Sequence, residues 1–339
     1  EDWLYFQDDP FAPPPDDYPY LDELNSGEAY RKTYAQLITH NQRQILVPIP
    51  LYIDGAVTGQ FDNLQVTALK MSIGILNGKA RDKEHAWRSL GFVPNYSKED
   101  AKGKMMFKES GHVGYKEIYG DEDEGEEERH PHAPKVHPAA DYHTILGVLL
   151  ESLKKLIVDG MVVNIKYKGK VYKDCELVYF VPFVKCDGVD GDKLCHHYRS
   201  RNTNVQQHCR YCDCPTNETD NPLVKFKYKE EEKLKKLYQR KQWDKLREMS
   251  QNPVENAFHG LRFGLHNRRG IHGACPLDML HAILLGIFMY VRDCFFEQIG
   301  PTSQAAKDIN GMSRNIGVSL ARQSDRDKPR TKFSRGIDK

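Results

Sequence analysis

The chain has 339 residues, a formal net charge of +1, 39% hydrophobic residues and 10% aromatic residues. This is enough apolar material for one large domain, or for two domains, with a hydrophobic core. There is no signal-peptide pattern and no apolar run long enough to span a bilayer. We therefore expect an intracellular chain without a membrane partner, and the start at Glu1 indicates a piece of a longer protein.

The N-terminal part is predicted to be an arm followed by a helix. Residues 1–20 are rich in Asp, Pro and aromatic residues, as is typical of a linker or a surface arm. Residues 21–40 favour a helix, with Asn25 or Ser26 as its N-cap and Glu28 in its first turn. We assign residues 1–40 to this arm and helix.

Three strands are predicted next. An apolar run over residues 45–53 is broken by two prolines and ends at Asp54-Gly55, where we expect a turn over residues 55–62. Residues 64–76 mix β-branched and apolar side chains and favour a second strand. Residues 86–93 favour a third strand, which Pro94 ends.

A helix and two more strands follow an acidic insertion. Residues 95–140 are acidic and contain several histidines, so we expect a solvated insertion. Apolar residues then recur at helical spacing up to Gly160, and strands are predicted over 161–167 and 176–184. Asp187 follows the last strand. Residues 41–190 therefore predict an α/β core, a mixed sheet with flanking helices.

The last part of the chain is predicted to be a helical insertion with a cysteine-rich start. Four of the eight cysteines crowd into residues 195–214, which favours metal binding over disulfides in a reducing compartment. Residues 225–249 predict a charged helix or a pair of helices, and residues 276–297 predict an apolar helix. We assign residues 191–300 to a zinc-binding and helical insertion and residues 301–339 to a polar tail. The basic stretches 225–247 and 314–339 suit a polyanionic partner, although charged surface helices are the commoner explanation of such stretches.

Asp54 and Asp187 are candidate metal ligands. A carboxylate at the end of a buried strand needs a cation or several donors, although a turn residue beside Gly55 is the simpler reading of Asp54. Two carboxylates on neighbouring strand ends can hold the Mg²⁺ ions that neutralise charge during phosphoryl transfer. Asp190 and Asp192 lie close enough in the sequence to be alternatives to Asp187.

Cys209 and Cys212 form a C-x-x-C pair, which places two thiolates at zinc distance on one side of a tight turn. The alternative is a redox pair or free thiols. A zinc ion would need further ligands, and the candidates are nearby or downstream residues: Cys195, His208, Cys214, His272 and His281. A histidine on an apolar helix, such as His281, is more often a core residue than a ligand.

The order of these motifs resembles DDE transposases of the CACTA and Plavaka/KDZ group of DNA transposons, over residues 20–300. The residues that carry the resemblance are Leu51-Tyr52-Ile53-Asp54-Gly55, Asp187, Asp192-Lys193-Leu194-Cys195, Cys209-x-x-Cys212, Gly270-Ile271-His272-Gly273 and Asp278-x-x-His281. The resemblance implies an RNase H-like core interrupted by a zinc-knuckle and helical insertion. It also implies metal-dependent cleavage and transfer of DNA strands at transposon ends and target DNA, a nuclear location and assembly as a homo-oligomer.

By position, the resemblance assigns Asp54 and Asp187 as the first and second catalytic acids, with Mg²⁺ or Mn²⁺ as their metal. It assigns Cys209 and Cys212 as a zinc pair, with His272 and His281 as partners. The family's third acid, usually Glu, is not evident, because the one glutamate near a suitable position, Glu297, lies on the same predicted helix as His281. We therefore expect little catalysis from this chain alone. A zinc-stabilised DNA-binding or interaction protein without chemistry is the alternative, and a plain globular domain is a third reading.

Overall fold

A computed structural model describes residues 4–6, 9–12, 23–40, 42–58, 64–94, 138–198, 205–221, 223–300, 302–309 and 311. Contacts divide the chain into two units, Glu1–Pro276 and Leu277–Lys339, and each is described by itself. The predicted acidic insertion falls outside the described residues up to position 137. Its last residues, 138–140, belong instead to the first turn of a helix.

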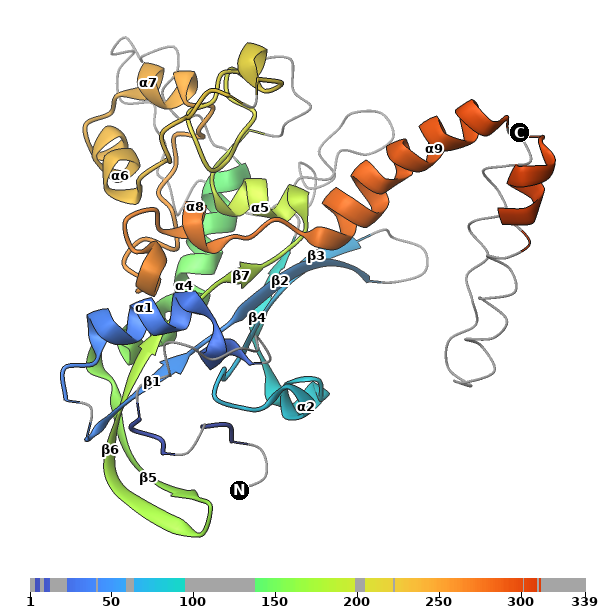
Figure 1. The fold of residues 1–339 in the computed structure, drawn as a ribbon. Helices are drawn as coiled ribbons and strands as arrows, with labels where there is room; N and C mark the ends of the chain where they lie inside the picture. The colour runs from blue at the N-terminus through green and yellow to red at the C-terminus, as the bar shows by residue number, and fades with distance from the viewer. Residues whose placement is uncertain are drawn as a thin grey trace. The chain divides into compact units, whose positions relative to one another are not determined.

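The first unit contains two mixed sheets (Figure 1). The three-stranded sheet has the order β1 (Gln44–Pro48), β6 (Lys170–Phe180) and β5 (Met161–Tyr167). The four-stranded sheet has the order β4 (Trp87–Pro94), β3 (Leu64–Ser72), β2 (Leu51–Thr58) and β7 (Val184–Lys185). The β1–β6 and β2–β7 pairs are parallel, and all the other pairs are antiparallel. The expected mixed α/β architecture is confirmed.

The two parallel pairs continue one another along the chain. Between them, the Ile49 amide donates to the Phe180 carbonyl at 2.8 Å, and the Leu51 amide donates to the Phe183 carbonyl at 3.1 Å. Prolines at positions 48, 50 and 182 have no amide hydrogen, so the regular ladder is interrupted there. Each predicted strand, 45–53 and 176–184, is consequently divided into two in the structure.

The turn predicted over residues 55–62 begins too early, and its residues 59–62 lie outside the described part of the chain. β2 runs through Asp54 and Gly55 to Thr58, and Asp54 pairs with Ala68 of β3. The residues after Gly55 are Ala, Val and Thr, and the latter two favour strands, so the antiparallel pairing with β3 outweighs the local turn signal of the glycine. Asp54 therefore projects from the middle of a strand.

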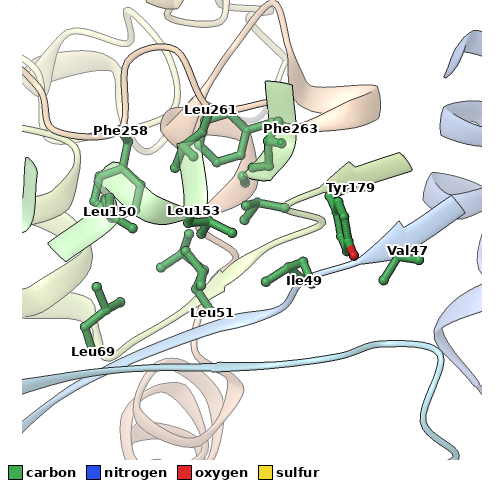
Figure 2. Close-up of a cluster of buried hydrophobic side chains, with 14 of the residues drawn as sticks. Val47, Ile49, Leu51, Leu69, Leu150, Leu153, Tyr179, Phe258, Leu261 and Phe263 are labelled. Carbon is green, nitrogen blue, oxygen red and sulfur yellow. The ribbon is translucent and has the colours of Figure 1, made fainter. Parts of the chain in front are cut away.

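Helix α4 (Pro138–Asp159) supplies much of the core. Its buried residues recur at helical spacing, and Figure 2 shows Leu150 and Leu153 packed close to Leu51 of β2 and Phe258 of a later loop. Gly91 of β4 faces this helix, and a β-carbon there would collide with the Leu149 side chain. The helix ends as predicted at Gly160, whose positive φ of 67° favours glycine.

The remaining helices of the first unit are short. The helix predicted over 21–40 is divided into η1 (Leu24–Ser26) and α1 (Glu28–Leu37), with Gly27 rather than Asn25 or Ser26 as the N-cap of α1. The charged stretch forms a pair, α6 (Glu231–Gln239) and α7 (Trp243–Glu248). The others are α2 (Gly78–Arg81), η2 (Glu84–Ala86), α5 (Gly188–Leu194), η3 (Thr216–Glu218), η4 (Gly264–His266) and α8 (Ile271–Ala274).

The second unit contains a π-helix, η5 (Leu280–Ile287), that continues into α9 (Phe288–Ile299). Many of its large apolar side chains are exposed, including Leu284, Ile287 and Tyr290. The predicted apolar helix thus begins at Leu280 rather than Pro276. Among the described helices, none has the length and hydrophobicity needed to cross a bilayer.

Candidate functional site

The parallel pairing of β2 with β7 brings the two predicted acids to one edge of the core. The register pairs Leu51 with Val184 and Tyr52 with Lys185, so Asp54 and Asp187 each follow two residues after the last paired position. Asp54 is half-buried, and the Tyr52 hydroxyl donates a hydrogen bond of 2.6 Å to its Oδ2. This bond orients the Asp54 carboxylate.

Asp187 and Asp190 lie at the start of α5. Asp187 is the N-cap residue, and its Oδ1 accepts a 2.6 Å bond from the Asp190 amide. Asp190 is buried, its Oδ1 lies 2.8 Å from the Lys193 ammonium, and its Oδ2 lies 3.9 Å from the place that a β-carbon on Gly55 would occupy. The side chain of Asp190 is therefore the one that the structure places directly beside β2.

Asp192 is turned to a different partner. Its Oδ1 lies 3.1 Å from Nη1 of Arg210, and both side chains are largely buried. Burial raises the pKa of Asp192, and the Arg210 charge opposes that rise. The sequence left Asp187, Asp190 and Asp192 as alternatives for the second metal ligand. The ion pair with Arg210 makes Asp192 the least suitable of the three.

Tyr142 of α4 is a neighbour of these acids that the sequence gave no reason to single out. Burial, then the charges of Asp190, Cys186 and Asp187, raise the pKa of its hydroxyl well above the ordinary value. The buried hydroxyl has no hydrogen-bond partner among the described residues. A neutral donor therefore stands close to the acidic turn. No motif in the sequence could have shown this, because α4 and α5 meet only in the folded chain.

Cys209 and Cys212 lie in a turn that a neighbouring segment holds in place. The Lys229 amide donates to the Tyr211 carbonyl at 2.9 Å, and Cys212 forms a bridge with Tyr228. Burial, together with the neighbouring Cys209 thiol, raises the pKa of Cys212 to about 11. The two thiols of the C-x-x-C pair thus lie side by side and half-buried, and the Cys212 thiol is protonated at neutral pH.

Two buried cations flank this turn. The Lys229 ammonium donates to the carbonyls of Cys209 and Met249 at 3.0 and 3.1 Å, and burial lowers its pKa to about 8. Arg210, between the two cysteines, also donates from Nη1 to the Gly188 carbonyl at 2.7 Å. Through this side chain the cysteine turn is bonded directly to the first residue of α5, beside the acids.

The two predicted histidine partners lie in different units. His272 on α8 is buried, its Nδ1 lies 2.9 Å from the Arg210 carbonyl, and burial lowers its pKa to about 3, so the ring is neutral. His281 belongs to the second unit, where its Nδ1 bonds to Asp278. The hydrogen bond from His281 holds the pKa of Asp278 below its ordinary value.

Within the part of the chain that the structure describes, no three His, Cys, Asp or Glu side chains are grouped so that they could hold a metal ion. The acids provide hard oxygen donors and the cysteines provide soft sulfur donors, so the chemistry of each set fits the metal predicted for it. A groove of about 470 Å³ lies elsewhere, between α1, Phe180, Phe183 and α8, and no candidate acid lines it.

Comparison of the sequence with models of known protein families gives no match, and a search among curated proteins finds none that resembles it.

Proposed function

We propose that the first unit is the core of a DDE-type transposase, an RNase H-like domain that carries out metal-dependent phosphoryl transfer on DNA. The observation that carries this proposal is the strand order β4-β3-β2-β7. The successive strands β2, β3 and β4 pair antiparallel, and α4 and the antiparallel strands β5 and β6 follow before the chain returns to β2 through the parallel strand β7. Three antiparallel strands, a helix and a later strand parallel to the first are the connectivity expected of an RNase H-like core.

This topology supports a shared role for Asp54 and the acids of α5. Asp54 lies on the central strand, and Asp190 lies beside it, across from Gly55. When bound, Mg²⁺ or Mn²⁺ would neutralise charge on the attacking and leaving oxygens of the phosphate. Asp54 and Asp190 would hold the ion, with Asp187 fixing the turn as the helix cap or contributing as the family resemblance assigns it.

Neighbouring side chains orient one of these carboxylates and neutralise the charge of the other. The Tyr52 hydroxyl orients Asp54, and the Lys193 ammonium offsets the negative charge of buried Asp190 in the absence of an ion. A bound divalent ion would compete with this ammonium for Asp190. The third acid of the family has no equivalent among the described residues of the first unit, and Glu297 lies on α9 of the second unit.

We further propose that Cys209 and Cys212 hold a structural zinc ion. The half-buried thiols provide two of the four ligands that such a site needs, and the buried positive charges of Lys229 and Arg210 would stabilise the thiolates. The remaining ligands would come from Cys214 and His272 of the same unit. An ion here would stiffen the turn whose Arg210 side chain holds the start of α5.

The DNA partner is supported by exposed basic side chains on and around α6 and α7. They are Lys225, Lys227, Lys233, Lys236, Arg240, Lys241 and Lys245. Phosphate contacts from such side chains give affinity without sequence selection, and they do so equally for a cleaving enzyme and for a protein that only binds. A nuclear location and assembly of several copies on DNA belong to the same proposal.

The test combines metal binding with DNA cleavage. Binding of Mn²⁺ is measured by loss of the free-ion electron paramagnetic resonance signal, and cleavage by nicking of supercoiled plasmid in Mn²⁺. We expect Asp54→Asn and Asp190→Asn to weaken Mn²⁺ binding and to abolish the low level of nicking that an incomplete set of acids allows. Asp174→Asn, on an exposed residue of β6 whose φ of 51° suits asparagine, is the control and should change neither.

Binding of Mn²⁺ that survives both substitutions would refute the proposed metal site. Mn²⁺ binding without nicking, combined with plasmid binding that weakens steeply with salt, would favour the second candidate function, a zinc-stabilised DNA-binding protein derived from such a core. The absence of a third grouped carboxylate among the described residues is the observation that favours this candidate.

A further inference from the structure

Three buried thiols from three separate segments meet in the first unit, outside the C-x-x-C turn. Cys186 follows β7, Cys195 is the C-cap residue of α5, and Cys275 is the C-cap residue of α8. Their exposed fractions are 4%, 0% and 0%. This thiol cluster is distinct from the predicted zinc pair.

Within the thiol cluster, one pair is placed for covalent bonding. The sulfur atoms of Cys186 and Cys275 lie 3.3 Å apart, and a disulfide needs about 2.05 Å. Cys195 joins the cluster through a side-chain contact with Cys275, and its thiol also donates to the Ile271 carbonyl, 4.0 Å away. By contrast, Cys175 has only carbonyl partners among its described contacts, and Cys294 is exposed in the second unit.

We propose that Cys186 and Cys275 are an oxidative modification site that a peroxide converts into an intramolecular disulfide. Peroxide oxidises one thiol to a sulfenic acid and releases one water. The sulfur of the second thiol then attacks the sulfenic sulfur, the S–S bond forms and a second water leaves. In total, two thiols and one hydrogen peroxide give one disulfide and two waters, with no other reactant.

This disulfide would connect the turn that carries the acids to the end of α8. Cys186 directly precedes Asp187, the cap of α5, and Cys275 directly precedes Pro276, the last residue of the first unit. The bond would close a loop between residues 89 positions apart, which reduces the freedom of the unfolded chain. It would also tie the acidic turn to the end of α8. Oxidation should therefore stabilise this part of the fold and restrict movement of the acids.

The test is peptide mapping of the folded 339-residue chain after exposure to hydrogen peroxide. Free thiols are alkylated under denaturing conditions without reductant, and the digest is analysed by mass spectrometry. We expect a linked peptide pair containing Cys186 and Cys275, lighter by two hydrogen atoms and separated by dithiothreitol. The unfolding midpoint of the oxidised protein should rise and should return to its starting value on reduction.

The variants separate this pair from other thiols. Cys186→Ala should remove the linked peptides, while Cys195→Ala and the buried control Cys175→Ala should keep them. Because mapping of the unchanged protein needs no variant, a substitution that fails to fold does not prevent the test. The proposal is overturned if Cys186 and Cys275 stay fully alkylatable after Cys294 has been oxidised. It is also overturned if the purified chain carries zinc that Cys186→Ala removes and Cys209→Ala does not.

Discussion

At the scale of single residues, Arg210 connects three parts of the first unit. Its guanidinium bonds to the Gly188 carbonyl and to Asp192, and its carbonyl lies 2.9 Å from the His272 ring. The side chain, which is only 7% exposed, joins the cysteine turn to α5, and the backbone carbonyl of the same residue joins the turn to α8. Arg210 is therefore a positioning residue for the acids rather than a ligand.

Replacing Arg210 tests this role. Arg210→Met leaves the buried Asp192 carboxylate without its partner, which costs roughly 3 kcal/mol of unfolding free energy. Urea denaturation measures the loss. The control is Arg268→Met, because Arg268 is 81% exposed in its ion pair with Glu230, and such pairs contribute about 0.5 kcal/mol. Equal losses in the two variants would contradict the central position of Arg210.

Glu231 gives a prediction about pH. It lies buried at the start of α6 against Gly270, where a β-carbon would collide with its carboxyl group, and burial raises its pKa from 4.5 to about 7. The folded state thus binds the proton more tightly than the unfolded state. Its stabilising contribution is complete below about pH 4.5 and is lost as the pH rises through about 7.

We expect Glu231→Gln to remove this dependence, so that the difference in unfolding free energy between variant and parent changes by on the order of 3 kcal/mol between pH 4.5 and pH 8. Taking the difference is necessary because buried neutral His143 and His272 act in the opposite direction. Glu232→Gln, on an exposed neighbour, should give no such change. A difference that is flat with pH would refute the raised pKa.

At the scale of elements, α4 joins the two sheets into one core. Its buried face consists of Leu146, Leu150, Leu153 and Ile157, and the close approach of Leu149 to β4 depends on Gly91. We expect Leu150→Ala to lower the unfolding free energy by about 3 kcal/mol, through lost burial and the cavity left behind. Val148→Ala, 68% exposed on the same helix, should change it by less than about 0.5 kcal/mol. Chemical denaturation of the two variants provides the comparison.

At the scale of the whole molecule, the two units differ in how their apolar side chains are placed. The first unit buries its core, while η5 and α9 of the second unit expose Leu284, Leu285 and Phe288 among others. We expect a chain that ends at Pro276 to keep the unfolding midpoint of the parent and to self-associate less, since exposed apolar patches promote association. Light scattering and thermal unfolding measure both. A large drop in the midpoint would show that the first unit depends on the second.

The sequence by itself determined most strands and helices of the core and the cysteine motif, because apolar periodicity and residue spacing are local properties of the chain. Period-2 and helical apolar patterns located β3, β4, β5 and α4 to within a few residues, and the C-x-x-C spacing placed the Cys209 and Cys212 thiols together. The local signal misled at Gly55, where pairing with β3 extends the strand beyond the expected turn.

Only the tertiary structure decided which distant side chains meet. The parallel pairing of β2 with β7 brings Asp54 near α5, and the rotation of that helix directs Asp190 to Gly55 and Asp192 to Arg210. Residues 187, 190 and 192 are equivalent in the sequence because their spacing alone does not say which face of α5 meets the sheet. The meeting of three thiols from three segments has the same physical origin, because it depends on packing between elements and not on any local pattern.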